Sequence, residues 1–294
     1  MNIFVDASYV IYYSVYGAYK MWQNSYKDRY KERISGPTLT DQPDITNDDK
    51  FQHCLQKKLE HNMDKIFYVI KNNVYDGSQP TGLRPKVYFI HDANGGKDWR
   101  KEIFKEYKAH RKLVPKEFHV SKAFQYIKDV IMPKMNFEEY FGVRSMEVDR
   151  AEADDIIMSL ISRMKHPHNV IIGTDHDYIQ VLDNARMFDL VGKEISAEGI
   201  SGKITKDRVL SPQEYLKVKC IMGDKSDGIP SIRNKVGPKT AYKIFNDPSL
   251  LTEELKDKRA AERYESNINL IDCKNVPVEI QREIINVYRE NKIR

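Results

Sequence analysis

Short apolar runs that each end in an acidic residue restrict the fold of this chain more than any other feature. The runs NIFV, VYFIH and NVIIGT are followed by Asp6, by Asp92 and by the pair Asp175 and Asp177. Segments with apolar residues at helical spacing lie between these runs, and 51–72 is the longest of them. Strands that alternate with helices predict a mostly parallel central sheet flanked by helices, which is the α/β class.

The same patterns predict the order of elements along the chain. We expect strands at 2–5, 86–90, 143–148, 169–173 and 186–191, and helices at 51–72, 99–112, 119–132, 150–164 and from 174 to 182. Residues 192–205 indicate a hairpin or loop, and the chain is helical from residue 211 onward. We therefore expect an α/β domain over 1–205 and a smaller helical domain over 206–294.

Composition favours a globular protein of the cytoplasm, which would be the host cytoplasm if the chain is viral. Charged residues make up 31% and hydrophobic residues 40%, and no apolar run is long enough to span a membrane. The first ten residues, MNIFVDASYV, predict a strand rather than a signal peptide. Cys54, Cys220 and Cys273 are scattered without zinc-ligand spacing, which is typical of free thiols in a reducing compartment.

Two segments carry an excess of positive charge. Residues 97–122 contain nine basic and four acidic residues, and residues 203–243 contain ten basic and four acidic ones. Basic segments in a chain that also has acidic clusters indicate one surface for a polyanion and another for metal ions. A solvated, charged protein surface is the ordinary alternative.

The acids that follow strands are expected to converge at one edge of the sheet, because the carboxyl ends of parallel strands form its ligand crevice. Glu152, Asp154 and Asp155 add three carboxylates at the start of the helix expected at 150–164. Carboxylates at close range repel unless a cation lies between them, and Mg²⁺ prefers oxygen ligands. Each acid taken alone could equally be a helix cap or an acid at the positive end of a helix.

Several motifs, in this order, resemble the signature of the 5′-nuclease, or flap endonuclease, family. They are EADD at 152–155, TDHD at 174–177, GDKSDGIP at 223–230 and VGPKTA at 236–241. The stretch WRKEIFKEYKAHR at 99–111 is similar to the 5′-nuclease domain of bacterial replicative-repair polymerases. Arg263-Tyr264, NINLID at 267–272 and Val276-Pro277 are similar to the T-even bacteriophage ribonuclease H branch.

The resemblance implies a PIN-like 5′-nuclease core, an arch at about 112–142, and a helix-hairpin-helix-type DNA clamp in the helical domain. It implies a Mg²⁺-dependent 5′-to-3′ exonuclease and flap endonuclease that removes RNA primers and 5′ flaps in replication and leaves 5′-phosphate products. Two Mg²⁺ ions, which Mn²⁺ could replace, would be shared by nine acids: Asp6, Asp92, Glu152, Asp154, Asp155, Asp175, Asp177, Asp224 and Asp227.

The resemblance also implies contacts with nucleic acid. Arg100, Lys108 and Arg111 would contact the scissile phosphate from one face of a helix, and Tyr107 would stack on a base. The clamp residues would be Lys235, Gly237, Lys239 and Thr240, with the glycine at a helix start that faces a phosphate. The linker before Gly237 departs from the family pattern, since it carries Arg233, Asn234 and Lys235 and is slightly longer.

The expected partners are branched or 5′-ended DNA and RNA–DNA duplex, and a single-stranded DNA-binding protein or a sliding clamp of the replisome. We expect a monomer that does not contact a membrane. Two other functions remain open on the sequence. One is a junction-binding protein with little or no catalysis, and the other is a PIN-like ribonuclease that acts on single-stranded RNA.

Overall fold

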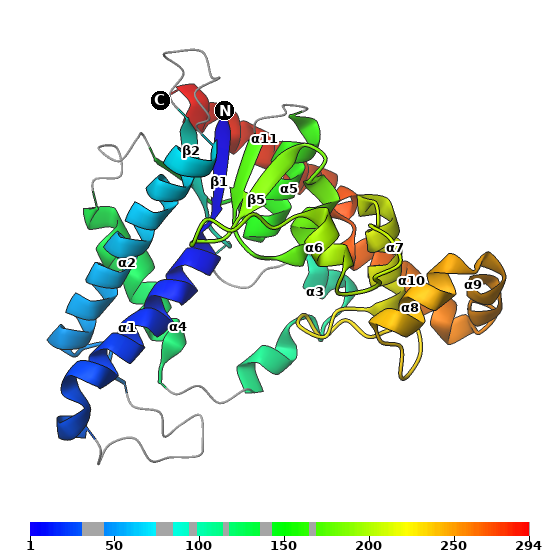
Figure 1. Ribbon diagram of the computed structural model, residues 1–294, viewed down its shortest axis with the longest axis horizontal. Helices are drawn as coiled ribbons and strands as arrows, with labels where there is room; N and C mark the ends of the chain where they lie inside the picture. The colour runs from blue at the N-terminus through cyan, green and yellow to red at the C-terminus, as the bar shows by residue number, and fades with distance from the viewer. Residues whose placement is uncertain are drawn as a thin grey trace.

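A five-stranded parallel sheet forms the centre of the molecule in the computed structural model, which describes residues 1–30, 44–74, 85–93, 99–113, 118–135, 143–164 and 169–293 (Figure 1). The strands are β1 (Asn2–Asp6), β2 (Lys86–Ile90), β3 (Arg144–Met146), β4 (Asn169–Ile172) and β5 (Ala185–Phe188). Their order across the sheet is β3-β2-β1-β4-β5, and every neighbouring pair is parallel. The predicted fold class is confirmed.

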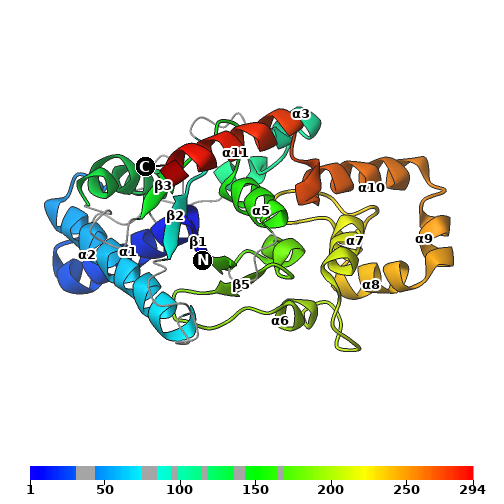
Figure 2. The ribbon, with the colours of Figure 1, turned by 90° about the horizontal axis from the view of Figure 1, so that it is seen from above.

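The helices of the amino-terminal part are α1 (Ala7–Tyr30), α2 (Asp49–Val69), α3 (Arg100–Ile103), α4 (Val120–Tyr126), α5 (Ala153–Arg163) and α6 (Ala197–Ser201). Those of the carboxyl-terminal part are α7 (Pro212–Met222), α8 (Pro238–Asn246), α9 (Pro248–Glu254), α10 (Lys258–Ile271) and α11 (Val278–Ile293). Shorter helical turns include η3 (Ala109–Leu113), after α3, and η6 (His176–Val181), after β4. Figure 2 shows α1, α2 and α4 at one end of the molecule and α7 to α10 at the other, with the sheet between them.

Side chains that alternate along each strand build a separate core on each face of the sheet. Ile3 and Val5 of β1 pack with α1, α2 and α4, whereas Phe4 between them packs with α5 and the carboxyl-terminal helices. The same alternation holds in β4, where Val170 and Ile172 lie on the first face and Ile171 on the second. The sheet is therefore the middle layer of three, and both of its faces are buried.

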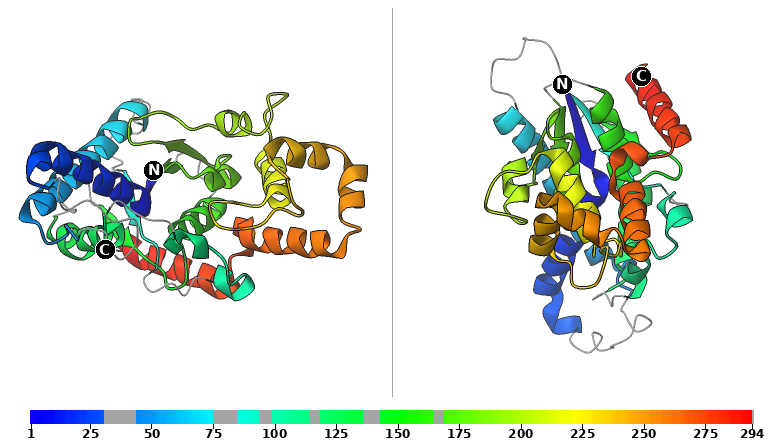
Figure 3. Two further views of the ribbon diagram at one scale, coloured as in Figure 1. Left: turned by 90° about the horizontal axis from the view of Figure 1, so that it is seen from below. Right: turned by 90° about the vertical axis from the view of Figure 1, so that its right-hand side faces the viewer.

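The carboxyl-terminal helices are not separated from the sheet by a break in the core. Residues of α7, α8 and α10 belong to the same buried cluster as α5 and the strands. Helix α11 then returns to the sheet and packs against α5 and β3 (Figure 3). Tyr288 of α11 lies with its ring centroid 5.3 Å from that of Tyr88 in β2. A domain boundary near residue 205 therefore stays a prediction, and α11 packs with the α/β part.

The segment 99–113 differs from the single helix that the sequence predicts. Helix α3 ends at Ile103, Phe104 adopts an extended conformation, and η3 begins only at Ala109. The predicted loop at 192–205 contains α6, and the segment after β4 forms the 3-10 helix η6. The arch expected at about 112–142 includes 114–117 and 136–142, which lie outside the described residues. No helix in the described ranges is both long and apolar enough to cross a membrane.

Candidate active site

The carboxyl ends of three adjacent strands bring acidic residues together. Asp6 is the last residue of β1, Asp92 follows β2 by two positions, and Asp175 follows β4 by three. Strand β1 lies between β2 and β4, with Asp6 opposite Ile90 and Val5 opposite Ile172. Asp154 in the first turn of α5 joins this group, which we call the central acids: Asp6, Asp92, Asp154 and Asp175.

Hydrogen bonds hold the central acids in place without neutralising them. Asp6 accepts from the backbone N–H of Tyr9 and from the hydroxyl of Tyr178, each at 3.1 Å. Asp92 accepts from the Ser8 hydroxyl at 2.5 Å and from the backbone N–H of Ala153 at 2.8 Å. Within the described residues, no lysine or arginine forms an ion pair with any of the four.

This crowding of unpaired acids changes their protonation. Burial, together with the nearby charges of Asp92 and Asp175, raises the pKa of Asp6 to about 7. Burial and the neighbouring Asp155 likewise place the pKa of Asp154 well above its usual range. A cation among these carboxylates would remove the repulsion that favours their protonated forms.

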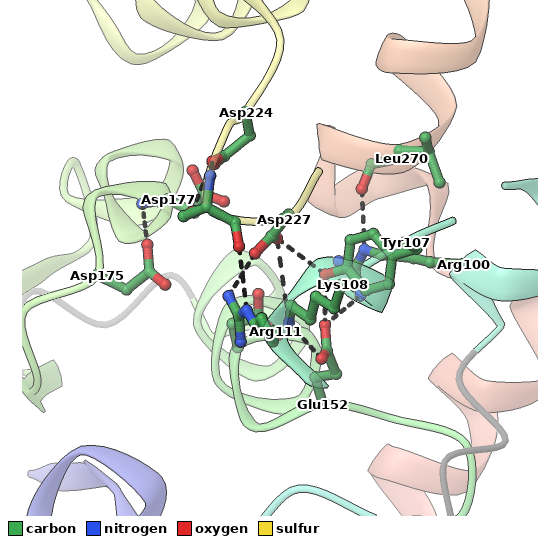
Figure 4. A network of polar contacts seen from close by, with 12 residues as sticks. Arg100, Tyr107, Lys108, Arg111, Glu152, Asp175, Asp177, Asp224, Asp227 and Leu270 are labelled. Atoms are coloured by element: carbon green, nitrogen blue, oxygen red, sulfur yellow. Dashed lines mark hydrogen bonds and ion pairs between the residues drawn. The ribbon is translucent and has the colours of Figure 1, made fainter. Parts of the chain in front are cut away.

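A second group of acids, by contrast, is neutralised by side-chain cations (Figure 4). Glu152, the N-cap of α5, pairs with Lys108, and Asp227 pairs with Arg111 through a 2.6 Å contact. The Tyr107 hydroxyl lies 2.7 Å from Glu152 and 2.9 Å from Asp227. Burial raises the pKa of Glu152, but Lys108 and Arg100 outweigh it, so this pKa lies below its usual value.

Arg100 and Asp155 form a buried pair behind this group. Two Arg100 nitrogens donate to the two carboxylate oxygens of Asp155 at 2.7 and 3.0 Å, and its Nε donates to the carbonyl of Leu270. The indole N–H of Trp99 donates to Asp155 at 3.0 Å. Arg100 is 4% exposed and Asp155 is fully buried. In this structure the pair joins α3 and α5 to α10 rather than facing a ligand.

Two expectations about segment 99–111 do not match its conformation in this structure, and the contacts of its residues with nucleic acid stay predictions. Arg100 is buried and saturated by Asp155 and Leu270, so it does not share an exposed face with Lys108 and Arg111. Tyr107 is 1% exposed, and its ring lies under Lys108 and Arg100 instead of being open to a base. The chain turns at Lys108, which has a positive φ of 55°, and this turn aims Lys108 and Arg111 at the acids.

A third group of acids is built around a lysine that the sequence analysis missed. The Lys219 ammonium of α7 contacts Asp177 closely and lies 2.8 Å from Asp224. Asp224 also accepts from the backbone N–H and hydroxyl of Ser226, at 2.7 and 2.6 Å. Lys219 falls on the buried stripe of α7 with Tyr215 and Val218. A lone lysine at an apolar helix position is the signal that could have identified it.

The predicted clamp corresponds to two helices, α7 and α8, joined by the loop 223–237. Gly223 has φ of 71°, and a Cβ there would lie 2.5 Å from the Ile229 carbonyl, so the turn requires glycine. Helix α8 begins after Gly237 with no side-chain cap, and Lys235 and Lys239 are exposed beside it. Arg233 of the linker pairs with Glu254 of α9. A cavity of about 570 Å³ extends from Asp175 and Asp224 to Gly237 and Pro238.

The residues fit divalent metal ions by chemistry but not yet by geometry. All nine predicted ligands are carboxylates, which suit a hard cation such as Mg²⁺. In the described part of the chain, however, no three Asp, Glu, His or Cys side chains lie close enough together to hold an ion as they stand. Five of the nine acids are paired with Arg100, Lys108, Arg111 or Lys219: Glu152, Asp155, Asp177, Asp224 and Asp227.

An α/β sheet with clustered acids at its carboxyl edge is the architecture of a resolvase-like nuclease domain. The family model for the 5′-3′ exonuclease N-terminal resolvase-like domain matches residues 59–211 of this chain. The chain therefore belongs to the 5′-3′ exonuclease family.

Curated relatives agree with this assignment. The 5′-3′ exonuclease of Buchnera aphidicola subsp. Schizaphis graminum is 32% identical over 159 residues, which are 53% of this chain and 50% of that protein. DNA polymerase I of Lactococcus lactis subsp. cremoris is 30% identical over 222 residues, which are 71% of this chain and 23% of that protein. The chain thus spans half or less of the length of these relatives.

Solved structures show the same fold. The phage T5 flap endonuclease in a complex with DNA and metal ions has a TM-score of 0.58 at 15% identity, with 100% of this chain and 99% of that chain covered. A T5 protein crystallised with metal ions has a TM-score of 0.60 at 16% identity, with 99% and 98% covered. At such low identity the likeness establishes the fold alone.

Proposed function

We propose that this protein is a divalent-metal-dependent 5′-nuclease that cuts phosphodiesters at the 5′ ends and flaps of DNA and RNA–DNA duplexes. The observation that carries the proposal is a group of four acids at the adjacent ends of β1, β2 and β4 and the start of α5, none of which forms an ion pair with a described lysine or arginine. Bound Mg²⁺ or Mn²⁺ ions would supply charge neutralisation and an activated water for hydrolysis. The proposal includes primer and flap removal in replication and 5′-phosphate products.

The basic side chains beside the acids would position the phosphate. Lys108 and Arg111 extend from the turn after Tyr107, and the Arg111 side chain is 51% exposed. Arg111 offers a planar fork that suits phosphate oxygens, and Lys108 offers a point charge. Lys108 contacts Glu152, and Arg111 contacts Asp227. A phosphate bound beside these acids would therefore be close to two cations that the fold already holds in position.

Base contact is better supplied by Tyr12 than by Tyr107. Tyr12 of α1 is 46% exposed, and its ring centroid lies 5.0 Å from that of Phe124 in α4. The nearby charges of Arg111 and Asp92 both affect the pKa of its hydroxyl, which supports a position for Tyr12 at the rim of the site. An exposed ring can stack on any base without reading sequence, as cleavage by structure requires.

Duplex on the far side of the cut would be held by α8. Its uncapped amino terminus, after Gly237, offers backbone N–H groups to a phosphate, and Lys239 and Thr240 lie in its first turn. The cavity between Asp175 and Pro238 gives a continuous path from the central acids to this helix. Contacts of this kind fix the position of a duplex and carry no sequence preference.

Replacing Asp175 by Asn tests the proposal without disturbing the fold. Asp175 is exposed and caps η6 through the N–H of Asp177, a role that Asn also performs. We expect Mg²⁺-dependent cutting of a labelled 5′-flap substrate to fall by at least about 100-fold, the scale of lost electrostatic stabilisation. The control is Asp183→Asn, an exposed acid beyond η6.

Two results would contradict the proposal. One is full cutting by the Asp175→Asn protein. The other is a wild-type protein that binds the flap but does not cut it with any divalent ion, which would leave a junction-binding protein. Cleavage of single-stranded RNA in preference to the flap would instead support the PIN-like ribonuclease.

A further inference from the structure

The Lys219 ammonium occupies an unusual position, because it is a buried cation between two acids of the candidate metal site. Its side chain is 7% exposed, and its nitrogen contacts Asp177 closely and lies 2.8 Å from Asp224. The two acids come from different parts of the fold, since Asp177 is in η6 after β4 and Asp224 follows α7. Lys219 therefore links the acid that follows β4 to the acid that follows α7.

The Lys219 ammonium neutralises the charge of these two acids, as a bound metal ion would. Asp177 is crowded by Asp175 as well as by Asp224, and the nearby acids would repel one another without a cation. Among the described residues, by contrast, no lysine or arginine forms an ion pair with a central acid. An ammonium that contacts both carboxylates cannot share them with a divalent ion at the same time, because like charges at that range repel strongly.

We propose that Lys219 is a built-in counter-ion that holds Asp177 and Asp224 together before metal binds, and that must leave them when a divalent ion is bound there. This inference rests on the metal-dependent nuclease proposed above. Metal loading on this side of the site is then an exchange of one cation for another. The cavity of about 570 Å³ beside Lys219, between Asp224 and Gly237, gives the displaced ammonium a place to move.

The exchange predicts opposite effects for two substitutions at one position. Lys219→Met keeps an unbranched side chain but removes the competing charge, so Mn²⁺ should bind at least about tenfold more tightly, within the usual range of coupling between ligands. Lys219→Arg keeps the charge and adds a bidentate fork for the two carboxylates, so Mn²⁺ should bind more weakly than to the wild type. A residue with a merely structural role would shift affinity in the same direction in both variants.

Calorimetric titration of the whole chain with Mn²⁺, and then with Mg²⁺, measures these affinities. Thermal denaturation provides a second readout: Lys219→Met should melt earlier than the wild type in chelator and recover most of that loss in saturating Mn²⁺. The control is Lys217→Met, on the exposed side of the same helix, which should leave both readouts unchanged.

Equal Mn²⁺ affinity in the wild type and Lys219→Met would overturn the inference, as would a loss of melting temperature that Mn²⁺ does not reduce. If Lys219→Met does not fold in chelator, Lys219→Arg still decides, because unchanged or tighter Mn²⁺ binding by that variant contradicts the exchange. Failure of the nuclease proposal is distinguishable, since the wild type would then show neither saturable Mn²⁺ binding nor flap cutting.

Discussion

At the scale of single residues, the environment divides nine similar acids into different roles. Asp154 and Asp155 are neighbours in the first turn of α5, yet Asp155 is bound on both oxygens by Arg100 while Asp154 has no ion pair within the described residues. The helix turns by about 100° per residue, so adjacent side chains meet different surroundings. The candidate ligands thus fall into two classes: acids that form an ion pair with a described lysine or arginine, and acids that do not.

This division predicts that Asp155 stabilises the fold. Asp155→Asn removes the carboxylate that both terminal nitrogens of the buried Arg100 contact, whereas Glu152 lies farther away at 3.3 Å. Breaking a buried pair costs about 3–5 kcal/mol. Urea unfolding in chelator measures this loss in the free energy of unfolding. Asp175→Asn, at an exposed cap, should change the same quantity by less than about 1 kcal/mol. A small loss for Asp155→Asn would show that Arg100 finds another partner.

The buried side chain of His91 is expected to make the free energy of unfolding depend on pH. Burial, with the charge of Lys128, lowers the pKa of this imidazole from 6.5 to about 4. The unfolded chain therefore binds a proton that the folded chain does not, so stability falls as pH decreases from about 6.5 to about 4. The shift corresponds to up to about 3 kcal/mol. Urea unfolding at several pH values should show a shallower loss in His91→Asn, and an identical slope would contradict this.

At the scale of elements, tertiary contacts override local helix propensity between residues 99 and 113. The pattern favours a continuous helix, but the backbone N–H of Lys108 donates to the carbonyl of Asp227 at 2.8 Å and fixes a turn. Phe104 packs with the cluster around Ile229 and Leu270, in the carboxyl-terminal helical part. Contacts with a loop more than one hundred residues away in the sequence are invisible to periodicity.

The start of α8 gives a prediction that belongs to the element. A Cβ at Gly237 would meet no atom within 4 Å, and its φ of −101° suits any residue. Gly237→Ala should therefore keep the melting temperature within about 2 °C of the wild type, because the added methyl group contacts no other atom and needs no change of backbone conformation. Its affinity for a flap duplex should fall several-fold if a phosphate approaches the backbone there. Unchanged affinity in a gel-shift titration would remove Gly237 from the clamp.

At the scale of the whole molecule, the two ends of the chain are joined through α11. Ile284 is fully buried against the cluster that includes Phe4 and Ile157, and the Tyr288 hydroxyl lies 3.4 Å from the Asn2 side chain. The core is therefore continuous past residue 205, although the change from alternating strands and helices to helices alone predicts two domains.

Ile284→Ala should therefore destabilise the entire chain. Loss of a buried isoleucine costs about 2–5 kcal/mol. We expect one unfolding transition at lower urea concentration, with far-ultraviolet circular dichroism and tryptophan fluorescence changing together, because Trp22 and Trp99 both lie in the amino-terminal part. Two separated transitions would show that the carboxyl-terminal helices unfold independently. The exposed position Glu283→Ala, next in sequence, is the matched control.

Local patterns along the chain are enough to predict the parallel sheet and the acids at its carboxyl edge. Strand alternation is a local pattern, and the position of a residue just after a parallel strand dictates which edge it occupies. Which acids are paired depends on tertiary contacts, since Arg100, Lys108, Arg111 and Lys219 reach them across long sequence separations. The burial of Tyr107 and the exposure of Tyr12 depend on the same long-range packing. Charge pairing and burial are properties of three-dimensional neighbours, which no single segment of the chain specifies.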